Sequence, residues 1–327
     1  MTQLHARLVS FPLREAFTIA RGSKTEARVV EVSLEEGPHI GRGEAVPYAR
    51  YGETCDGVLT DVRTMAPWLA ARPPDGATRR ALLEAMPAGA ARNALDLALI
   101  DLASKQAGER AWTHLGVPAP APTRITQTVP IVDPASTQAR VAGIRAPVIK
   151  LKLGRPDDLA RVQAAREGAP ASRLIVDANE SWDMATLTRM APPLAHVGVE
   201  LIEQPLPADD DDALTNYRGP IPLCADESCH GTDLAGLAAC YQAINLKLDK
   251  AGGLTAALEL LEQAESAGLA VMLGCMVASS LAIAPATLLT HRARWVDLDG
   301  ATFLSDDRPG LRLDARGLHP PEPTLWG

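Results

Sequence analysis

The sequence predicts an α/β protein in which a barrel of parallel strands follows a smaller α+β domain. After residue 123, eight short apolar stretches alternate with amphipathic helical segments, which is typical of strand–helix–strand units. Eight such units close most simply into a barrel whose functional site lies at the carboxyl ends of the strands. An open doubly wound sheet is the competing architecture. It normally carries a glycine-rich phosphate loop after its first strand, and the sequence has none there.

The smaller domain is expected over residues 1–117. The stretch at 26–37, EARVVEVSLEEG, is strand-like, and the stretch at 92–108, RNALDLALIDLASKQAG, is helix-like. Asp96 and Asp101 lie at helical spacing in the second stretch, and we interpret both as structural rather than catalytic.

The segment VPAPAPT at 117–123 is typical of a short extended linker, and the barrel is expected over 123–300. The predicted strands span 125–131, 148–154, 173–179, 199–205, 221–227, 243–249, 270–276 and 294–300. After the sixth strand, GGLTAALELLEQAESAG places Leu254, Leu258 and Leu261 on one face of a predicted helix, directly after two glycines.

Bulk properties exclude several classes of partner. The net charge of -8 argues against nucleic acid and anionic membranes. The stretch 266–290 is uncharged and long enough to span a bilayer, but Pro285 interrupts it, so we interpret it as a buried strand, a turn and a helix. Five scattered cysteines and an N-terminus without an apolar signal core predict a reducing, cytoplasmic location.

Charged residues end the second to sixth predicted strands. They are Lys152, Asp177, Glu203, Asp226 and Lys247. Three carboxylates on adjacent strands would converge, and they need a cation between them. Oxygen ligands favour Mg²⁺, or alternatively Mn²⁺, over zinc. Each acid taken alone could instead cap the following helix, but that interpretation does not account for three acids in register between two lysines.

The lysines at these strand ends are placed by the alternation of side chains along a strand. Lys150 and Lys152 share a face, and Lys152 is nearer the end. Lys247 shares the polar face with Asn245, whereas Lys250 is expected on the other face, in the following loop. We therefore prefer Lys247 as the functional lysine. The second and sixth strands of such a barrel lie opposite each other, so Lys152 and Lys247 would flank a bound ligand.

This arrangement suits removal of a proton α to a carboxylate. A metal ion would bind the substrate carboxylate and stabilise the enolate, while one lysine removes the proton and the other returns one to the opposite face. Two opposed bases imply inversion at a carbon. The predicted reaction class is therefore racemase or epimerase, and no organic cofactor is expected.

The last predicted strand carries a second pair of acids, Asp297 and Asp299, among apolar neighbours. Alternate residues of a strand share a face, so both carboxylates would point the same way. Two like charges held together in apolar surroundings require a cationic partner. A second metal site, or simple caps, are the alternatives to a ligand cation.

Five motifs, KLKLG, VDANESW, LIEQPLP, CADES and NLKLDKAGG, resemble the enolase superfamily, muconate-lactonizing subgroup, over almost the whole chain. The resemblance implies a (β/α)7β TIM-like barrel with an α+β capping domain, residues 1–117, completed by the tail 301–327. Lysine bases with Mg²⁺ are the known pattern of that superfamily. It implies metal ligands at Asp177, Glu203 and Asp226, bases at Lys152 and Lys247, and orienting groups at Asn179 and Glu227.

The Asp297–Asp299 pair resembles the dipeptide epimerase branch, where such a pair holds the α-ammonium of the substrate. IARGSKTEARVV, PYARYGE, AGAARNALD and ITQTVPI are similar to enzymes acting on L-Ala-D-Glu from cell-wall peptides, which implies a role in murein peptide degradation. The resemblance implies that PYARYGE forms a second cap loop over the site and that Arg21 meets the glutamate side-chain carboxylate. The further residues implied at the substrate are Thr128, Lys150 and Cys275.

Alternatives of the same and of another class remain open at this point. N-acylamino acid racemases, o-succinylbenzoate synthases and cycloisomerases share the fold and lysines, but they do not account for the Asp297–Asp299 pair. A non-catalytic peptide-binding barrel would not need a base on each face. No histidine ends a strand, which disfavours the dehydratase branches. Cys224, Cys229 and His230 lack a second pair of ligands for zinc. The sequence leaves open whether the protein is a homo-oligomer.

Overall fold

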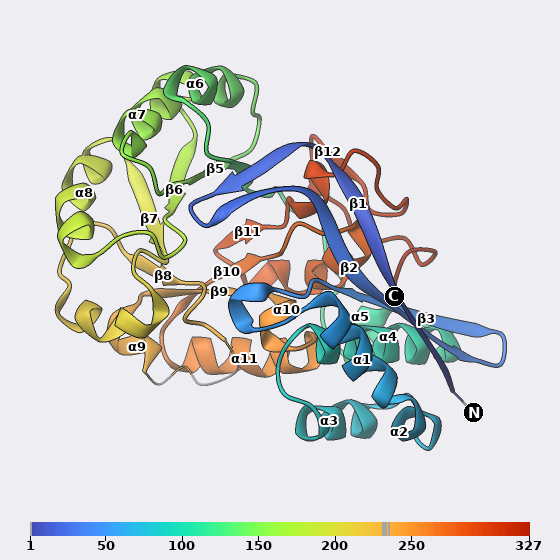
Figure 1. The fold of residues 1–327 in the computed structure, drawn as a ribbon. Helices are drawn as coiled ribbons and strands as arrows, with labels where there is room; N and C mark the ends of the chain where they lie inside the picture. The colour runs from blue at the N-terminus through green and yellow to red at the C-terminus, as the bar shows by residue number, and fades with distance from the viewer. Residues whose placement is uncertain (1, 231–233, 235) are drawn as a thin grey trace.

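The computed structural model describes residues 2–230, 234 and 236–327. Eight parallel strands form one sheet in the order β11-β10-β9-β8-β7-β6-β5-β4, and they surround a common centre (Figure 1). The strands are β4 (Gln127–Val129), β5 (Val148–Lys152), β6 (Arg173–Asp177), β7 (Val199–Glu203), β8 (Leu223–Ala225), β9 (Ala243–Leu246), β10 (Ala270–Gly274) and β11 (Trp295–Asp297). The predicted barrel is confirmed, and the open doubly wound sheet is not the architecture.

Helices and 3-10 helices connect these strands and pack on the outside of the sheet (Figure 1). They are α6 (Pro134–Ala142), α7 (Asp158–Gly168), α8 (Met184–His196), η2 (Ala208–Asn216), α9 (Leu237–Cys240), α10 (Leu248–Ala251), α11 (Leu254–Ser266), α12 (Ser280–Ile283) and η3 (Ala284–Arg292). The short η4 (Gly300–Phe303) follows the last strand, β11. Alternate strand residues such as Ile175, Leu201 and Met272 fill the barrel interior instead. The side-chain alternation therefore separates an outer apolar layer from an inner one that carries the functional groups.

The first part of the chain forms a separate antiparallel sheet, β1 (Gln3–Ile19), β2 (Gly22–Glu36) and β3 (His39–Ala45). Its helices are η1 (Ala49–Tyr51), α1 (Cys55–Thr64), α2 (Ala66–Ala70), α3 (Gly76–Ala85), α4 (Ala90–Ala107) and α5 (Ala111–Leu115). Helix α4 packs directly on β3, because a Cβ at Gly41 or Gly43 would lie 2.3 or 2.1 Å from a helix carbonyl. The expected α+β character of this domain is confirmed.

The β1–β2 turn and the C-terminal tail are among the segments that bring the first domain and the barrel together. The turn between β1 and β2 extends over the opening of the barrel (Figure 1). The C-terminal tail, with the short strands β12 (Leu313–Asp314) and β13 (Gly317–Leu318), returns to the first domain, where Gly327 donates a 2.7 Å hydrogen bond to Asp101. The exact domain boundaries stay a prediction.

The uncharged stretch 266–290 contains a buried strand, a turn and helical segments, as predicted. Among the described residues, no helix is long and apolar enough to cross a membrane.

Candidate active site

The polar residues at the strand ends lie in register. Lys152 pairs with Asp177 in the ladder between β5 and β6, and Asp177 pairs with Glu203 in the next ladder. Asp226 follows β8 directly, and Lys247 follows β9 directly. The apolar runs thus end at one level of the barrel, and the five predicted residues lie there.

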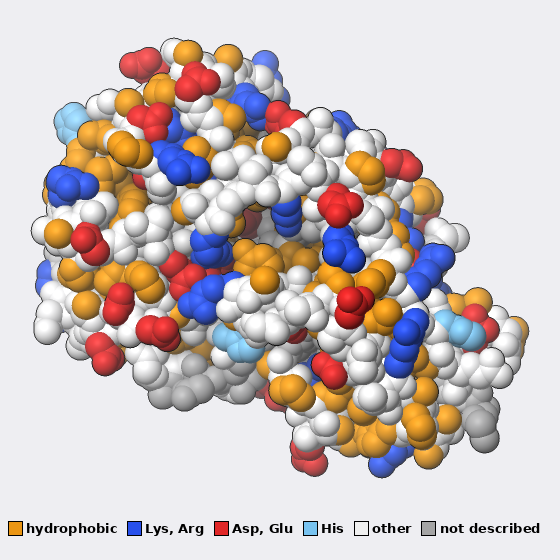
Figure 2. Space-filling view, in the orientation of Figure 1, with side chains coloured by type: hydrophobic (Ala, Val, Ile, Leu, Met, Phe, Trp, Pro, Cys, Tyr) orange, Lys and Arg blue, Asp and Glu red, His pale blue; other side chains and the backbone are white. Residues whose placement is uncertain are grey.

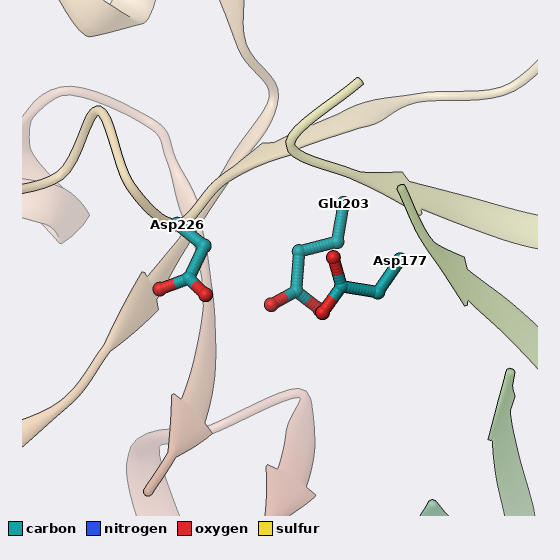
Figure 3. Close-up of side chains that lie close together, drawn as sticks. All are labelled: Asp177, Glu203 and Asp226. Atoms are coloured by element: carbon teal, nitrogen blue, oxygen red, sulfur yellow. The ribbon is translucent and has the colours of Figure 1, made fainter. Parts of the chain in front are cut away.

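Asp177, Glu203 and Asp226 point toward one another from three neighbouring strands (Figure 3). One oxygen from each lies within 4.8 Å of the others, and all three side chains are buried. A donor set made only of carboxylate oxygens fits a hard divalent cation such as Mg²⁺. Within the described part of the chain, no such cluster includes Cys224, Cys229 or His230, so the zinc interpretation has no support.

Three lysines balance the charge of these acids. Lys150 Nζ lies 2.7 Å from Glu203 Oε2, Lys247 Nζ lies 2.6 Å from Asp226 Oδ2, and Lys152 contacts Asp177. Burial and the charge of Asp177 raise the pKa of Glu203 to about 8. Burial also favours the protonated form of Asp177, but Lys152 and Lys150 outweigh it and lower the pKa of that carboxyl to about 2. The site is therefore organised to hold positive charge among its acids.

Lys250 corrects one expectation from the sequence. It does not lie away from the site in a loop, because the short helix α10 turns its side chain back to Asp226. Its ammonium donates to the backbone and side-chain oxygens of Asp226 and to the Asn245 carbonyl. Those three acceptors occupy its three N–H groups. Lys247, in contrast, lines the cavity and has one acidic partner, and the preference for Lys247 over Lys250 as the functional lysine stays a prediction.

Asp297 and Asp299 both face the cavity, although Asp299 lies beyond the end of β11. Asp297 accepts from Lys150 at 2.8 Å, and Asp299 accepts from the backbone N–H of Thr128 at 2.6 Å. The Thr128 hydroxyl lies 3.3 and 3.4 Å from the two carboxylates. Burial and the charge of Asp297 raise the pKa of Asp299 to about 7. A cationic ligand group at this place would relieve that repulsion.

The cavity between the cap and the barrel has a volume of about 500 Å³. Figure 2 shows the hollow near the middle of this face, with Lys and Arg side chains around it. The predicted residues that line it are Arg21, Thr128, Lys150, Lys152, Asn179, Asp226, Glu227, Lys247, Cys275, Asp297 and Asp299. Tyr48, Ala49, Arg50 and Tyr51 also line it, so the PYARYGE segment does form a second cap loop. Asp177 and Glu203 are completely buried and are not among the residues that line the cavity.

Arg21 reaches the site from the β1–β2 turn, but its charge is already shared. Its guanidinium contacts Glu227 and Glu180, and it donates to the Tyr48 hydroxyl at 3.1 Å and the Asn179 carbonyl at 3.0 Å. Glu227 contacts Arg21 and also accepts a hydrogen bond from the Asn179 side chain at 3.3 Å, and its orienting role stays a prediction. Asn179 donates its backbone N–H to Asp177 at 2.9 Å, which fits the orienting role expected for it.

Lys24 also lines the cavity, although no sequence pattern indicated it as a substrate-binding residue. It lies three residues after Arg21, and none of the ion pairs among the described residues involves it. Burial and the nearby charges of Lys152 and Lys247 lower its pKa to about 8. Its presence in the resembling stretch IARGSKTEARVV was the available signal, but the sequence around a lysine at the start of a strand does not indicate whether an acid neutralises it.

Residues 1–116 match the N-terminal domain model of mandelate racemase and muconate lactonizing enzyme, and residues 134–309 match the enolase C-terminal domain-like model. The chain is 43% identical over 315 residues to L-Ala-D/L-Glu epimerase of Escherichia coli K12, covering 95% of this chain and 97% of that protein. It is 42% identical over 310 residues to N-acetyl-D-glutamate racemase of a Pseudoalteromonas species, covering 91% and 95%.

Solved structures resemble this chain over almost its whole length. An enolase family member from Agrobacterium tumefaciens with homology to dipeptide epimerases, bound to sodium and L-Ala-L-Glu, has a TM-score of 0.94, 44% identity and complete coverage of both chains. Dipeptide epimerase from Enterococcus faecalis V583, complexed with Mg and L-Leu-L-Tyr, has a TM-score of 0.90 and 26% identity, covering 98% of this chain and 97% of that one.

Proposed function

This chain belongs to the mandelate racemase/muconate lactonizing enzyme family, and from that premise we propose that it epimerises dipeptides, above all L-Ala-D-Glu and L-Ala-L-Glu. The observation that carries the proposal is the buried pair Asp297 and Asp299, which share Thr128 as a partner and face the cavity. Two carboxylates held together there suit the α-ammonium of a free peptide N-terminus.

Asp177, Glu203 and Asp226 would hold the metal, Mg²⁺ or alternatively Mn²⁺. When bound, the ion supplies the positive charge that stabilises an enolate. Lys150 lies between this cluster and Asp297, where it would contact the substrate carboxylate.

Lys152 and Lys247 would act as the two bases. Lys152 ends β5 and Lys247 follows β9, four strands further in the eight-stranded sheet, so they approach the cavity from opposite sides. One lysine removes the proton from the α-carbon of the second residue, and the other delivers a proton to the opposite face. The configuration at that carbon is thereby inverted. In each direction the lysine that removes the proton must be neutral and the other lysine must be protonated. The removing lysine must therefore first release a proton to solvent and leave its carboxylate partner.

The side chain of the second residue would face the cap. Arg21 was expected to meet a glutamate carboxylate there, but Glu227 and Glu180 already share its charge. Lys24 lines the same cavity, and no acidic partner is found for it in the described part of the chain. We therefore assign Lys24 the larger share of binding to an acidic side chain, with Arg21 beside it. Cys275, whose thiol lies 3.4 Å from the Asp297 carbonyl, would contact the substrate without taking part in proton transfer.

A second candidate function is racemisation of N-acylated glutamate, and the Pseudoalteromonas relative supports it. That substrate offers the same carboxylates but no ammonium group. The acids Asp297 and Asp299 would then lack a cationic ligand, so this function ranks below the dipeptide epimerase.

The test is to incubate the protein with Mg²⁺ and L-Ala-L-Glu in D₂O and to follow the glutamate α-proton by NMR. Loss of that signal together with the appearance of L-Ala-D-Glu supports the proposal. Exchange with N-acetylglutamate but not with the dipeptide would select the second candidate. No exchange with either compound would overturn both.

A dipeptide epimerase of this specificity would serve murein peptide degradation. We further propose a cytoplasmic location, because all five cysteines are free thiols. The proposed partner is a small peptide substrate, and neither nucleic acid nor a membrane is proposed as a partner. A homo-oligomer stays a prediction.

A further inference from the structure

Helix α4 of the first domain contacts the segment that carries Lys247. Arg92, on the first turn of α4, donates to the Gly252 carbonyl at 2.9 Å and to the Ala251 carbonyl at 2.6 Å. These carbonyls end the short helix α10, which begins just after Lys247. A guanidinium interacts favourably with the partial negative charge at the C-terminal end of a helix. Arg92 therefore offsets the charge at this end of α10 and fixes its position.

The next residue of α4 holds the middle of the same segment. Asn93 donates to Asp249 Oδ1 at 3.0 Å, and the backbone N–H of Val46 donates to the same oxygen at 2.9 Å. Asn93 and Asp249 are both buried, so solvent does not compete for these bonds. Asp249 lies two residues after Lys247, so the hydrogen bonds that hold Asp249 also restrict the position of the Lys247 backbone.

One turn further along α4, Asp96 accepts from the backbone N–H of Thr255 at 2.9 Å and from its hydroxyl at 2.6 Å. The two glycines of the segment permit this close approach. A Cβ at Gly252 would lie 2.6 Å from Arg92, and one at Gly253 would lie 2.5 Å from Asp96, while both residues have positive φ. Asp96 is thus structural, as expected, and it belongs to the surface of α4 that holds this segment.

Helix α10 has a single turn, and so short a helix does not hold itself in place. Lys152 is held differently, in a continuous ladder with Asp177 inside the barrel. The segment that carries Lys247 is therefore supported by the cap, through Arg92 and Asn93, in addition to the contact of Lys247 with Asp226 in the barrel.

We infer that Arg92 and Asn93 are positioning residues that set Lys247, and not Lys152, for proton transfer. The inference rests on the proposed function, in which each lysine serves one epimer. Loosening the contact between α4 and the segment should displace one base and leave the other in place. The consequence is an unequal loss of two half-reactions, which a general loss of stability would not produce.

The experiment measures α-proton exchange in D₂O separately for L-Ala-L-Glu and L-Ala-D-Glu. Lys247→Ala first identifies which of the two exchange reactions uses Lys247. In Asn93→Ala, we expect that same reaction to fall about ten- to a hundredfold, because small displacements of a reacting group have effects of this size. The reaction that uses Lys152 should stay within about twofold of the wild-type rate on the same reasoning.

Asp101→Asn is the matched control. Asp101 is a buried acid of the same helix, but it accepts hydrogen bonds from the C-terminal tail and from β3 and not from the segment that carries Lys247. It should lower stability and affect both reactions alike. An equal loss of both reactions in Asn93→Ala, or no loss, would overturn the inference. If Asn93→Ala does not fold, Arg92→Lys decides by the same ratio, since lysine keeps the charge but loses the forked geometry. Absence of exchange in the wild-type protein would instead refute the proposed function.

Discussion

Lys150 joins the two acidic groups of the site, since its ammonium lies 2.8 Å from Asp297 and 2.7 Å from Glu203. The side chain is almost completely buried, with 1% of its surface exposed. Glu203 belongs to β7 and Asp297 to β11, two strands that are not neighbours in the sheet, and the two acids therefore share one cation. A charge added near Asp297 therefore changes the electrostatic environment of Glu203, and the reverse also holds.

Replacing Lys150 with methionine should destabilise the metal-free protein by about 3–5 kcal/mol, because buried carboxylates lose their common partner. Added Mg²⁺ should restore part of this loss. Denaturant unfolding with EDTA and with Mg²⁺ measures both effects. Arg292→Met is the control, because Arg292 pairs with Glu265 at the surface and its loss should cost roughly 1 kcal/mol or less. Equal losses in the two variants would contradict the prediction.

Metal removal should lower the thermal midpoint of the wild-type protein. A ligand at a hundred times its dissociation constant stabilises the folded state by about 2.7 kcal/mol. Asp226→Asn replaces one carboxylate of the cluster with a neutral amide, and the loss of this negative charge should abolish most of the stabilisation by Mg²⁺. Calorimetric scans of EDTA-treated protein with increasing Mg²⁺ provide the measurement. A variant that responds to Mg²⁺ as the wild type does would show that the ion binds elsewhere.

Replacing Asp299 with asparagine should reduce kcat/KM for L-Ala-L-Glu about a hundredfold, because the substrate ammonium loses a buried charged partner. The same change should leave kcat/KM for N-acetylglutamate unchanged or raise it, since that substrate brings no cation. The ratio of the two values is the measurement, and a general defect in folding would lower both. A matching decrease for both substrates would argue against an ammonium site at Asp297 and Asp299.

Replacing Lys24 with methionine should weaken the preference for L-Ala-L-Glu over L-Ala-L-Gln by about tenfold or more, because the glutamine side chain has nearly the same shape without the charge. Lys24→Arg should keep most of the preference. Arg21→Met is the comparison, and its larger effect should be on overall activity, since Arg21 ties the cap turn to Glu180 and Glu227. If Arg21→Met alone removes the preference, the side-chain carboxylate binds to Arg21 as the sequence first suggested.

The stability of the protein should depend on the protonation of Asp249. Burial raises the pKa of this carboxyl from 3.8 to about 7, so between those pH values the folded chain holds a proton that the unfolded chain has released. The stability that this group contributes is present at low pH and falls as the pH rises through that window. Asp249→Asn should flatten the decline by roughly 3–4 kcal/mol, one pKa unit being 1.36 kcal/mol. Urea unfolding at pH 4 and pH 8 tests this, and an unchanged slope would contradict it.

The barrel and its ring of strand-end residues were accessible from the sequence for a local reason. A short apolar run followed by a charged residue marks both a parallel strand and its carboxyl end, and the closure of eight strands brings those ends together. Lys152, Asp177, Glu203 and Asp226 are each signalled within a few residues of chain. The same alternation placed Asp297 and Asp299 on one face.

Contacts between segments far apart in the chain could be known only from the folded structure. Lys250 was misplaced because a single helical turn after β9, too short to leave a periodic signal, brings it back to Asp226. The acidic partners of Arg21, Glu180 and Glu227, lie more than 150 residues away, so no pattern around Arg21 reveals that its charge is shared and that of Lys24 is not. The contact of Asn93 with Asp249 spans 156 residues. Alternation along the chain determines which residues face the barrel centre, whereas packing between the domains determines which charges remain available to a substrate.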